Sequence, residues 1–361
     1  MKDLAKIFGV FFILVAAIPM LAFLQPEERR SSAYAVQNTA DETAYTAASE
    51  DTVQTEAPTS KAEETEPREE NDLLKVLDFT SGQVYELSLR DYVIGAVLAE
   101  MPATYCDEAL KAQAAAARTY AVRQREKQRL SPDPELLGAD ISNDSGKFQA
   151  YFTPEQARKF YGDGYDTYYE KVAAAVDATG NSVLVYEGEP IVAAFHSMSG
   201  GKTESAEVVW GSALDYLIPV ESAADEESPS YLDEQVFSEA EVRARIEAEY
   251  TDAVFDKNAA DWVKITERSA SGTVTAMTVC GKEMTGADFR RIFTLRSANF
   301  EVRYSEKSGD FSVTSKGYGH GVGMSQYGAN AMASKGSTWQ EILLHYYTGA
   351  EIVDMSELYS E

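Results

Sequence analysis

Cysteine and histidine are scarce in this chain. Its 361 residues include two cysteines and three histidines, and the histidines, His196, His320 and His345, are scattered along the sequence. Neither a Cys-x-x-Cys nor a His-Glu-x-x-His pattern is present. Because a zinc site needs several nitrogen or sulfur ligands held together, the sequence predicts no metal ion and no cofactor.

The two cysteines, Cys106 and Cys280, are far apart in the sequence. Spacing alone gives no geometric support for a bond between them. A disulfide and a pair of buried free thiols therefore both remain open.

Basic residues are few relative to acidic ones. The chain has 32 Lys and Arg against 59 Asp and Glu, which gives a formal net charge of −27. Binding to nucleic acid or to an anionic membrane needs clustered basic residues, so the composition argues against both as general functions. Only a local basic group is able to hold an anionic ligand. The 44% hydrophobic and 25% charged composition is ordinary for a folded soluble protein.

One long apolar stretch, residues 7–24, contains no charged residue. Its length is close to the minimum that spans a bilayer. Lys2 and Lys6 precede it, which predicts a cytoplasmic N-terminus and places everything after Leu24 outside the cytoplasm. A cleaved signal peptide is the alternative, and the small residues of 32–35 keep it open.

The chain after this stretch divides by composition. Residues 25–71 are rich in Glu, Asp, Thr, Ala and Ser, which predicts a disordered acidic linker. We expect one folded domain over 72–355, with a peripheral insertion near 223–260, and a short tail over 356–361. Within the insertion, the acidic stretch 223–250 predicts a loop and a peripheral helix.

Apolar spacing predicts a mixture of helices and strands. A hairpin is expected around Ser81 and Gly82, and the absence of a regular βαβ repeat indicates an α+β fold with mostly antiparallel strands. The Ser337–Gln340 spacing is that of a capping box and predicts the start of the last helix. The expected helices are 89–99, 107–128, 165–179 and 286–293, and the expected strands are 76–79, 84–87, 182–186, 191–195, 262–266 and 272–279.

Glu100 lies where the first of these helices must end, because Pro102 disfavours its continuation. A carboxyl group at a helix C-terminus faces the negative end of the macrodipole, which favours its protonated form. That is the form a general acid needs. Many ordinary surface helices also end in Glu, so position alone does not establish the role.

Arg118 lies on the alanine-rich helix that follows, whose small side chains allow close packing against Glu100. Its guanidinium is suited to orienting that carboxylate or a polar ligand, although a solvated helix charge is the simpler interpretation. An ion pair with Glu100 would favour the charged acid and oppose the dipole. The sequence leaves this balance open.

Two later segments concentrate polar residues and glycine. In residues 195–204, His196 and Lys202 flank a Ser-x-Ser-Gly-Gly turn after an apolar stretch. In residues 317–323 glycine occupies every second position, which, in an extended strand, leaves one face bare for the close approach of a backbone or ligand. A Gly-x-Ser-x-Gly elbow and a phosphate-loop ending are both missing, which argues against a serine hydrolase and a nucleotide site.

Five segments in this order resemble the stage II sporulation protein D family of membrane-anchored lytic transglycosylases. They are residues 99–121, 195–204, 209–211, 295–300 and 317–329. The resemblance implies a fold built around a substrate groove and places the catalytic acid at Glu100. It also implies substrate-binding roles, which we carry to Arg118, His196, Ser199, Lys202, Tyr318, His320, Gln326 and Tyr327.

The implied reaction cleaves the bond between N-acetylmuramic acid and N-acetylglucosamine in peptidoglycan and closes a 1,6-anhydro ring. A glycoside hydrolase ordinarily uses two carboxylates, whereas this family is expected to use one. Several relatives carry Cys and His in the loop after the arginine helix. The matching stretch here, residues 140–149, has neither, so we expect no structural zinc.

The resemblance further implies a setting. It predicts a single-pass membrane protein with its catalytic domain outside the cytoplasm, on the mother-cell side, acting on denuded glycan strands during engulfment in sporulation. The expected partners are a peptidoglycan amidase and a multi-pass membrane scaffold, with no nucleic acid. A related class, the amidase enhancers, supplies the alternative of a non-catalytic glycan-binding activator.

Overall fold

The computed structural model describes residues 73–144 and 146–359. The predicted anchor at 1–24 and linker at 25–71 lie outside these residues. Within the part described, no helix is long and apolar enough to cross a membrane. The predicted α+β fold is confirmed, because helices are mixed with strands that pair mainly in antiparallel fashion.

The described chain begins with the expected hairpin. Strands β1 (Leu73–Asp78) and β2 (Gln83–Ser88) are antiparallel, and the short β3 (Ile141–Ser142) adds to β1 in parallel. The Asp78 carboxylate accepts a hydrogen bond from Thr80 N at 2.9 Å, and Gly82 adopts φ +70° to close the turn.

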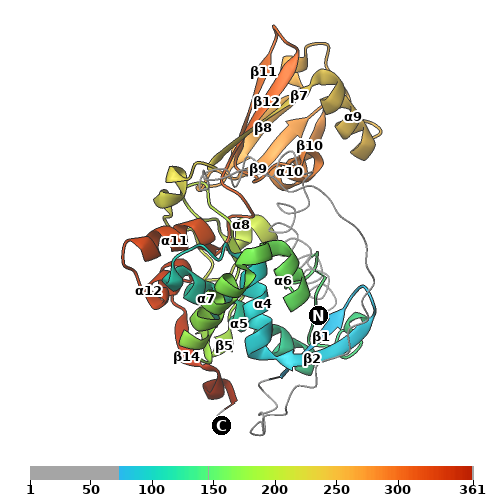
Figure 1. Cartoon of the computed structure of the whole chain (residues 1–361). Coiled ribbons are helices and arrows are strands. Elements are labelled where there is room, and N and C mark those ends of the chain that lie inside the picture. Colours follow the sequence, from blue (N-terminus) through green and yellow to red (C-terminus); the bar gives the residue numbers. More distant parts are fainter. Residues whose placement is uncertain (1–72, 145, 360–361) are drawn as a thin grey trace, which may run out of the picture.

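A layer of helices follows the hairpin (Figure 1). Ser88 caps α4 (Leu89–Glu100) through Asp91 N, and α5 (Asp107–Leu130) packs beside it. The alanines from Ala114 to Ala117 on α5 are fully buried, so neighbouring elements approach its backbone closely. Helices α6 (Pro154–Tyr161) and α7 (Tyr165–Ala178) complete the layer.

The C-terminal part of the chain returns to this layer. Strand β4 (Ser182–Tyr186) lies between β5 (Glu189–Pro190) and β14 (Glu351–Asp354), and β6 (Phe195–His196) pairs in parallel with β13 (Met324–Ser325). Helices α11 (Gln326–Ser334) and α12 (Trp339–Tyr346) pack on α5. The capping box of α12 joins Thr338 to Glu341, one residue later than predicted.

The predicted strand 191–195 is wrong except at its end. Only Phe195 and His196 are in a strand, and Ala194 N instead donates a local hydrogen bond to Val192 O at 2.8 Å. Gly323 lies against the carbonyl of Ala194. At this point the chain therefore packs against the irregular glycine-rich segment and not against a regular strand.

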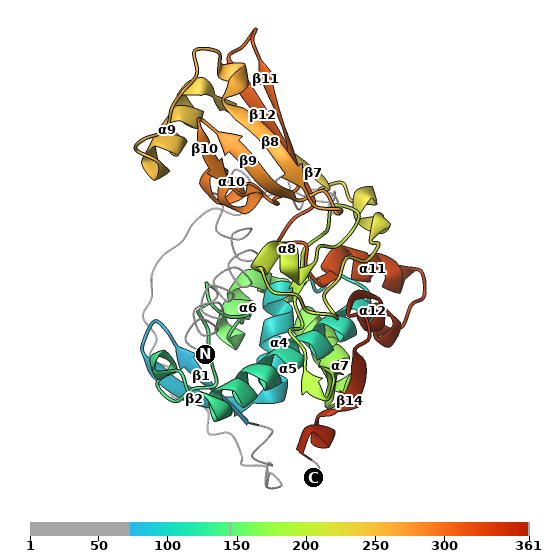
Figure 2. The same ribbon diagram turned by 180° about the vertical axis from the view of Figure 1, so that it is seen from behind.

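A second lobe has its own hydrophobic core, made of residues between Phe237 and Val313 (Figures 1 and 2). Phe237 on β7 packs into it, so part of the stretch expected as loop and helix is a strand. The lobe consists of two three-stranded sheets, two α-helices and a 3₁₀ helix. Its elements are β7 (Leu232–Ser238), α9 (Glu239–Glu249), β8 (Val263–Arg268), β9 (Val274–Val279), β10 (Lys282–Met284), α10 (Gly286–Phe293), β11 (Phe300–Ser305) and β12 (Asp310–Lys316).

The remaining helices are short. The α-helix α8 lies where the chain passes from the first lobe toward the second (Figure 2). The short helices are α8 (Ala206–Trp210) and the 3₁₀ helices η2 (Pro134–Leu136), η3 (Gly162–Gly164), η4 (Ala223–Glu227), η5 (Ala259–Asp261) and η6 (Met355–Tyr359).

The glycine-rich segment 317–323 is not the extended strand that the sequence suggested. Gly317, Gly319, Gly321 and Gly323 all have positive φ, at 72°, 117°, 81° and 73°. A Cβ on Gly323 would lie 2.0 Å from the carbonyl oxygen of Ala194. Glycine is therefore required twice over, by the backbone conformation and by the approach of residues 194–204.

Replacing Gly323 by Ala should destabilise the fold more than the positive φ alone explains. The matched control is Gly82→Ala, because Gly82 has φ +70° but nothing within 4 Å of the added methyl group. We expect a loss of about 1 kcal/mol in unfolding free energy for the control and about 3 kcal/mol or more for Gly323→Ala. Urea denaturation measures both, and equal losses would contradict the packing argument.

Candidate active site

Glu100 is the last residue of α4, and its carboxyl group is buried rather than surface-exposed. The residue is 6% exposed, and Oε1 accepts a hydrogen bond from Ala150 N at 2.7 Å. Oε2 is buried with no hydrogen-bond partner among the described residues. Burial raises the pKa of Glu100 to about 8, and the Ala150 N–H opposes this only in part. The acid is therefore mainly protonated at neutral pH.

The cause of the raised pKa differs from the one the sequence suggested. Loss of hydration dominates, whereas the prediction invoked the helix macrodipole. Both favour the protonated carboxyl group. Tertiary packing around Glu100, which no local pattern reveals, supplies the larger effect.

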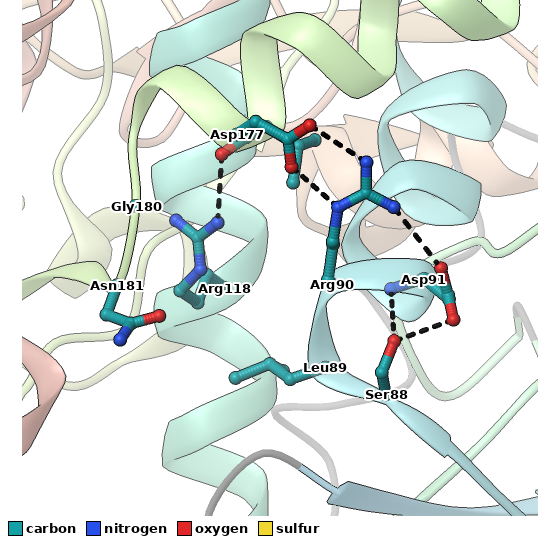
Figure 3. A pocket seen from close by; sticks show the side chains of 9 residues that line it. Ser88, Leu89, Arg90, Asp91, Arg118, Asp177, Gly180 and Asn181 are labelled. Carbon is teal, nitrogen blue, oxygen red and sulfur yellow. Dashed lines mark hydrogen bonds and ion pairs between the residues drawn. The ribbon is translucent and has the colours of Figure 1, made fainter. Parts of the chain in front are cut away.

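Arg118 does not face Glu100, contrary to the expectation. Its guanidinium donates to Thr179 Oγ1 at 3.0 Å and to the carbonyls of Val176 and Ser182 at 3.3 Å each. It lines a cavity beside the first turn of α4 (Figure 3). Glu100 lies at the other end of that helix, about 16 Å away at 1.5 Å per residue.

A polar stripe on α5, which the sequence analysis missed, faces the Glu100 region instead. Gln113 and Tyr120 are two turns apart on one side of the helix, whereas Arg118 is roughly 140° around from Gln113. Tyr120 Oη accepts from Gln149 N at 3.3 Å, next to the Ala150 N–H that binds Glu100. Polar residues at a seven-residue spacing within an alanine-rich helix were the available signal.

Gln326 joins the glycine-rich segment to this region. Its Nε2 donates to the backbone carbonyl of Glu100 at 2.9 Å and lies 3.2 Å from Gln113 Oε1. Because Gln326 directly follows β13, this side chain links β13, the end of α4 and α5. Of the predicted site residues, Gln326 is thus hydrogen-bonded directly to Glu100.

His196 and His320 lie side by side, with ring centroids 5.7 Å apart. Val322 bonds to both: His196 Nδ1 is 3.1 Å from its carbonyl oxygen, and His320 Nδ1 accepts from its N–H at 3.1 Å. His196 therefore carries its proton on Nδ1 and His320 carries its proton on Nε2. Burial lowers the pKa of His196 to about 4 and that of His320 well below its usual range, so both rings are neutral.

Ser199 is held by a buried acid that the sequence analysis did not single out. Asp225 is 0% exposed, and its Oδ2 accepts from Ser199 N at 2.8 Å and from Ser199 Oγ at 2.6 Å. Its Oδ1 accepts from Ser325 Oγ at 2.8 Å. Burial raises the pKa of Asp225. One carboxyl group thus fixes the 199–201 turn against the start of α11.

The other predicted site residues are more accessible. Lys202 has a side chain 38% exposed, with Nζ 3.3 Å from Glu221 Oε1. The backbone of Tyr318 pairs with Met198, and the Arg296 guanidinium lies 5.6 Å from the Tyr318 ring centroid. Tyr327, half-buried, donates its backbone N–H to Ser197 O at 3.0 Å. The structure therefore brings residues 196–202 and 318–327 together.

The cysteine alternatives are resolved in favour of free thiols. Cys106 is half-buried before α5, and Cys280 is buried in the second lobe. Burial raises the pKa of Cys280 to about 12. Within the described ranges, no group of three or more His, Cys, Asp or Glu side chains is arranged to hold a metal ion.

The burial of Glu100 leads to a prediction about the pH dependence of stability. Its pKa rises from 4.5 in the unfolded chain to about 8 in the folded one, so the native state binds the proton more tightly. The stability of the wild type relative to Glu100→Gln should therefore fall as pH rises through this window, by up to about 1.4 kcal/mol per pH unit. Urea denaturation of both proteins between pH 5 and 8 measures the difference.

Glu108→Gln is the matched control. Burial raises the pKa of Glu108, but hydrogen bonds from Lys111 and Trp339 outweigh that effect and lower it. The difference in unfolding free energy between Glu108→Gln and the wild type should not change with pH above pH 5. Parallel curves for wild type and Glu100→Gln would mean that Glu100 ionises normally.

A family model and several known proteins match this chain. The model of the stage II sporulation protein family, SpoIID, matches residues 78–186, which include Glu100, Arg118 and Ala150. A stage II sporulation protein D of Bacillus subtilis strain 168 is 35% identical over 353 residues, covering 98% of this chain and 96% of the relative. Another, from Bacillus amyloliquefaciens, is 39% identical over 279 residues, covering 77% of this chain and 78% of the relative.

A more distant relative has a different name. The amidase enhancer of Bacillus subtilis strain 168 is 28% identical over 304 residues, which cover 72% of this chain and 40% of the relative. The match to the two sporulation proteins is both closer and more complete. This chain belongs to the stage II sporulation protein D family.

Proposed function

We propose that this protein is a peptidoglycan lytic transglycosylase that acts on denuded glycan strands during sporulation. The proposal rests on the burial of the Glu100 carboxyl group. Its pKa of about 8 keeps it mainly protonated at neutral pH. A general acid works best when its pKa lies near the working pH. Membership in the stage II sporulation protein D family supports the sporulation setting.

In the proposed reaction Glu100 acts twice. The carboxyl group first gives its proton to the glycosidic oxygen, and the bond from that oxygen to C1 of N-acetylmuramic acid breaks. The carboxylate then takes the proton from the C6 hydroxyl of the same sugar, whose oxygen bonds to C1 and closes the 1,6-anhydro ring. Glu100 ends protonated as it began, and no water is consumed.

The Ala150 N–H has a defined part in this cycle. It donates to Oε1 at 2.7 Å, and such a bond stabilises the carboxylate more than the neutral acid. It therefore supports Glu100 in the interval when the proton has left. Because Glu100 Oε2 is buried, the residues that cover it must shift for the glycosidic oxygen to approach.

The other proposed substrate residues fall into two groups by burial. Lys202, Tyr318 and Tyr327 are partly exposed and are proposed to contact the sugar directly. His196, Ser199, His320 and Gln326 are buried, so in this conformation they support the segments that carry the first group. Arg118, at the other end of α4, is proposed to bind the glycan away from the cleaved bond.

We further propose that residues 1–24 anchor the protein in the membrane by a single span, with the catalytic domain outside the cytoplasm. In this setting the expected partners are a peptidoglycan amidase and a multi-pass membrane scaffold of the engulfment complex.

The second candidate function is a non-catalytic, glycan-binding activator of an amidase. The match to the amidase enhancer favours it, and so does the enclosure of Glu100 at 6% exposure. Under this alternative Glu100 is dispensable for function.

Digestion of denuded glycan strands distinguishes the two candidates. We expect the wild-type chain to release products with 1,6-anhydromuramic ends, and Glu100→Gln to lose at least about a hundredfold in rate because the acid is gone. Mass spectrometry of the products measures both. The wild-type rate should fall as pH rises past about 8, where Glu100 loses its proton.

Arg291→Gln, a substitution in the second lobe, serves as the control and should keep full activity. Reducing ends in place of anhydro ends would show hydrolysis and contradict the mechanism. Tight glycan binding with no cleavage by the wild type would favour the activator.

The membrane proposal has its own test. Immunoblotting of fractionated cells should find the full chain in the membrane pellet, released by detergent and not by high salt, because an apolar span rather than charge holds it. Deletion of residues 1–24 should move it to the soluble fraction. A shortened wild-type protein in the soluble fraction would indicate a cleaved signal peptide.

A further inference from the structure

A cavity of about 380 Å³ opens between the first turn of α4, the middle of α5 and the end of α7. Figure 3 shows Arg118 and Arg90 rising into it from neighbouring helices, with Asp177 beside both guanidinium groups. This volume falls in the range of small-molecule sites. The lining residues are Ser88, Leu89, Arg90, Asp91, Arg118, Val176, Asp177, Gly180 and Asn181.

Arg118 is an unusual component of this cavity. It is 4% exposed, and its three hydrogen bonds go to a hydroxyl group and two backbone carbonyls, all neutral. A guanidinium has five N–H donors, so these bonds do not exhaust it. A buried charge with no paired anion is costly. Accordingly, burial lowers the pKa of Arg118 to about 10, although Asp177 and Asp354 act against this from longer range.

The acidic residues of the cavity interact with Arg90. Asp177 accepts from Arg90 Nε at 2.6 Å and from Arg90 Nη2 at 2.9 Å, and Asp91 lies 3.6 Å from Arg90 Nη1 while accepting from Ser88 Oγ. Among the described residues no carboxylate hydrogen-bonds to Arg118. The charges of Arg90, Arg118, Asp91 and Asp177 sum to zero, so recognition of an anion here depends on donor placement rather than on net attraction.

We propose that this cavity is a separate subsite that binds the carboxylate of an acidic sugar through Arg118. The planar fork of a guanidinium suits two-pronged hydrogen bonding to a carboxylate. Leu89 and Val176 supply apolar lining, and Asn181 lies at the edge of the cavity (Figure 3). On the proposed function, that sugar is N-acetylmuramic acid in a glycan strand, whose lactyl carboxylate is free once the stem peptide is removed.

Such a subsite explains how an acidic protein recognises an acidic strand. The chain carries −27 overall, which gives no general attraction to a polyanion. The donors of Arg118 lie beside the first turn of α4, about 16 Å along that helix from Glu100, and there they hold a carboxylate without net attraction and set the register of a bound strand. A strand with its lactyl groups still joined to peptides lacks the free carboxylate.

The test is a titration of the full chain, in detergent micelles, with three probes: N-acetylmuramic acid, its methyl ester, and N-acetylglucosamine. The ester keeps the shape and removes the charge. We expect N-acetylmuramic acid to shift the amide NMR signals of Gly180 and Asn181, and to bind at least about tenfold more tightly than the other two. Equal affinities, or shifts elsewhere only, would overturn the proposal.

A substitution of the more exposed Arg90 gives a second test, which leaves the buried Arg118 in place. In Arg90→Gln, Asp177 loses its partner and becomes a competing anion for Arg118, so affinity for N-acetylmuramic acid should fall about tenfold or more. Arg291→Gln, which breaks a comparable two-pronged pair with Glu249 in the second lobe, should leave affinity unchanged. Unchanged affinity in Arg90→Gln would contradict the assignment.

Binding in Glu100→Gln separates this inference from the proposed function. The subsite predicts wild-type affinity in that variant, whatever its activity. Selective binding by a wild type that cuts no glycan would refute the transglycosylase and support the subsite. Normal cleavage without selective binding would do the reverse.

Discussion

The burial of a single carboxyl group at the end of α4 is the constraint on which the candidate site depends. Glu100 is enclosed because α5 is lined with alanine and lets α4 approach closely, and because the backbone at Ala150 covers the carboxyl group. Without compensation by a cation, loss of hydration keeps the group protonated. The same packing that stabilises the helical layer therefore prepares an acid.

The second half of the site is fixed through backbone geometry. Four glycines with positive φ let residues 317–323 lie against 194–204, where Val322 sets which ring nitrogen carries the proton in two neighbouring histidines. Gln326 then connects this region to the backbone of Glu100. Asp225 ties the Ser199 turn to the start of α11. Segments more than a hundred residues apart in sequence are thus joined to one another and, through Gln326, to the backbone of Glu100.

The sequence predicted the elements with strong local signals. The hairpin, α4, α5, α7 and α10 follow from apolar periodicity, capping residues and turn residues, and Glu100 follows from the helix break at Pro102 together with the family resemblance. Periodicity does not show which face of α5 packs against which neighbour. The sequence therefore predicts wrongly that Arg118 faces Glu100, and it does not identify Gln113 and Tyr120. Neither the role of Asp225 nor the strand β7 has a local sequence signature, because both depend on contacts with residues far away in the sequence.

The central claim is that Glu100 holds its proton at neutral pH because it is buried. Carbon NMR of a chain labelled at glutamate carboxyl carbons measures this directly, with Glu100→Gln identifying the signal. The account predicts a titration midpoint near 8. A midpoint near 4.5, the value for an ordinary glutamate, would show that the carboxyl group is hydrated and would contradict the assignment of Glu100 as the acid.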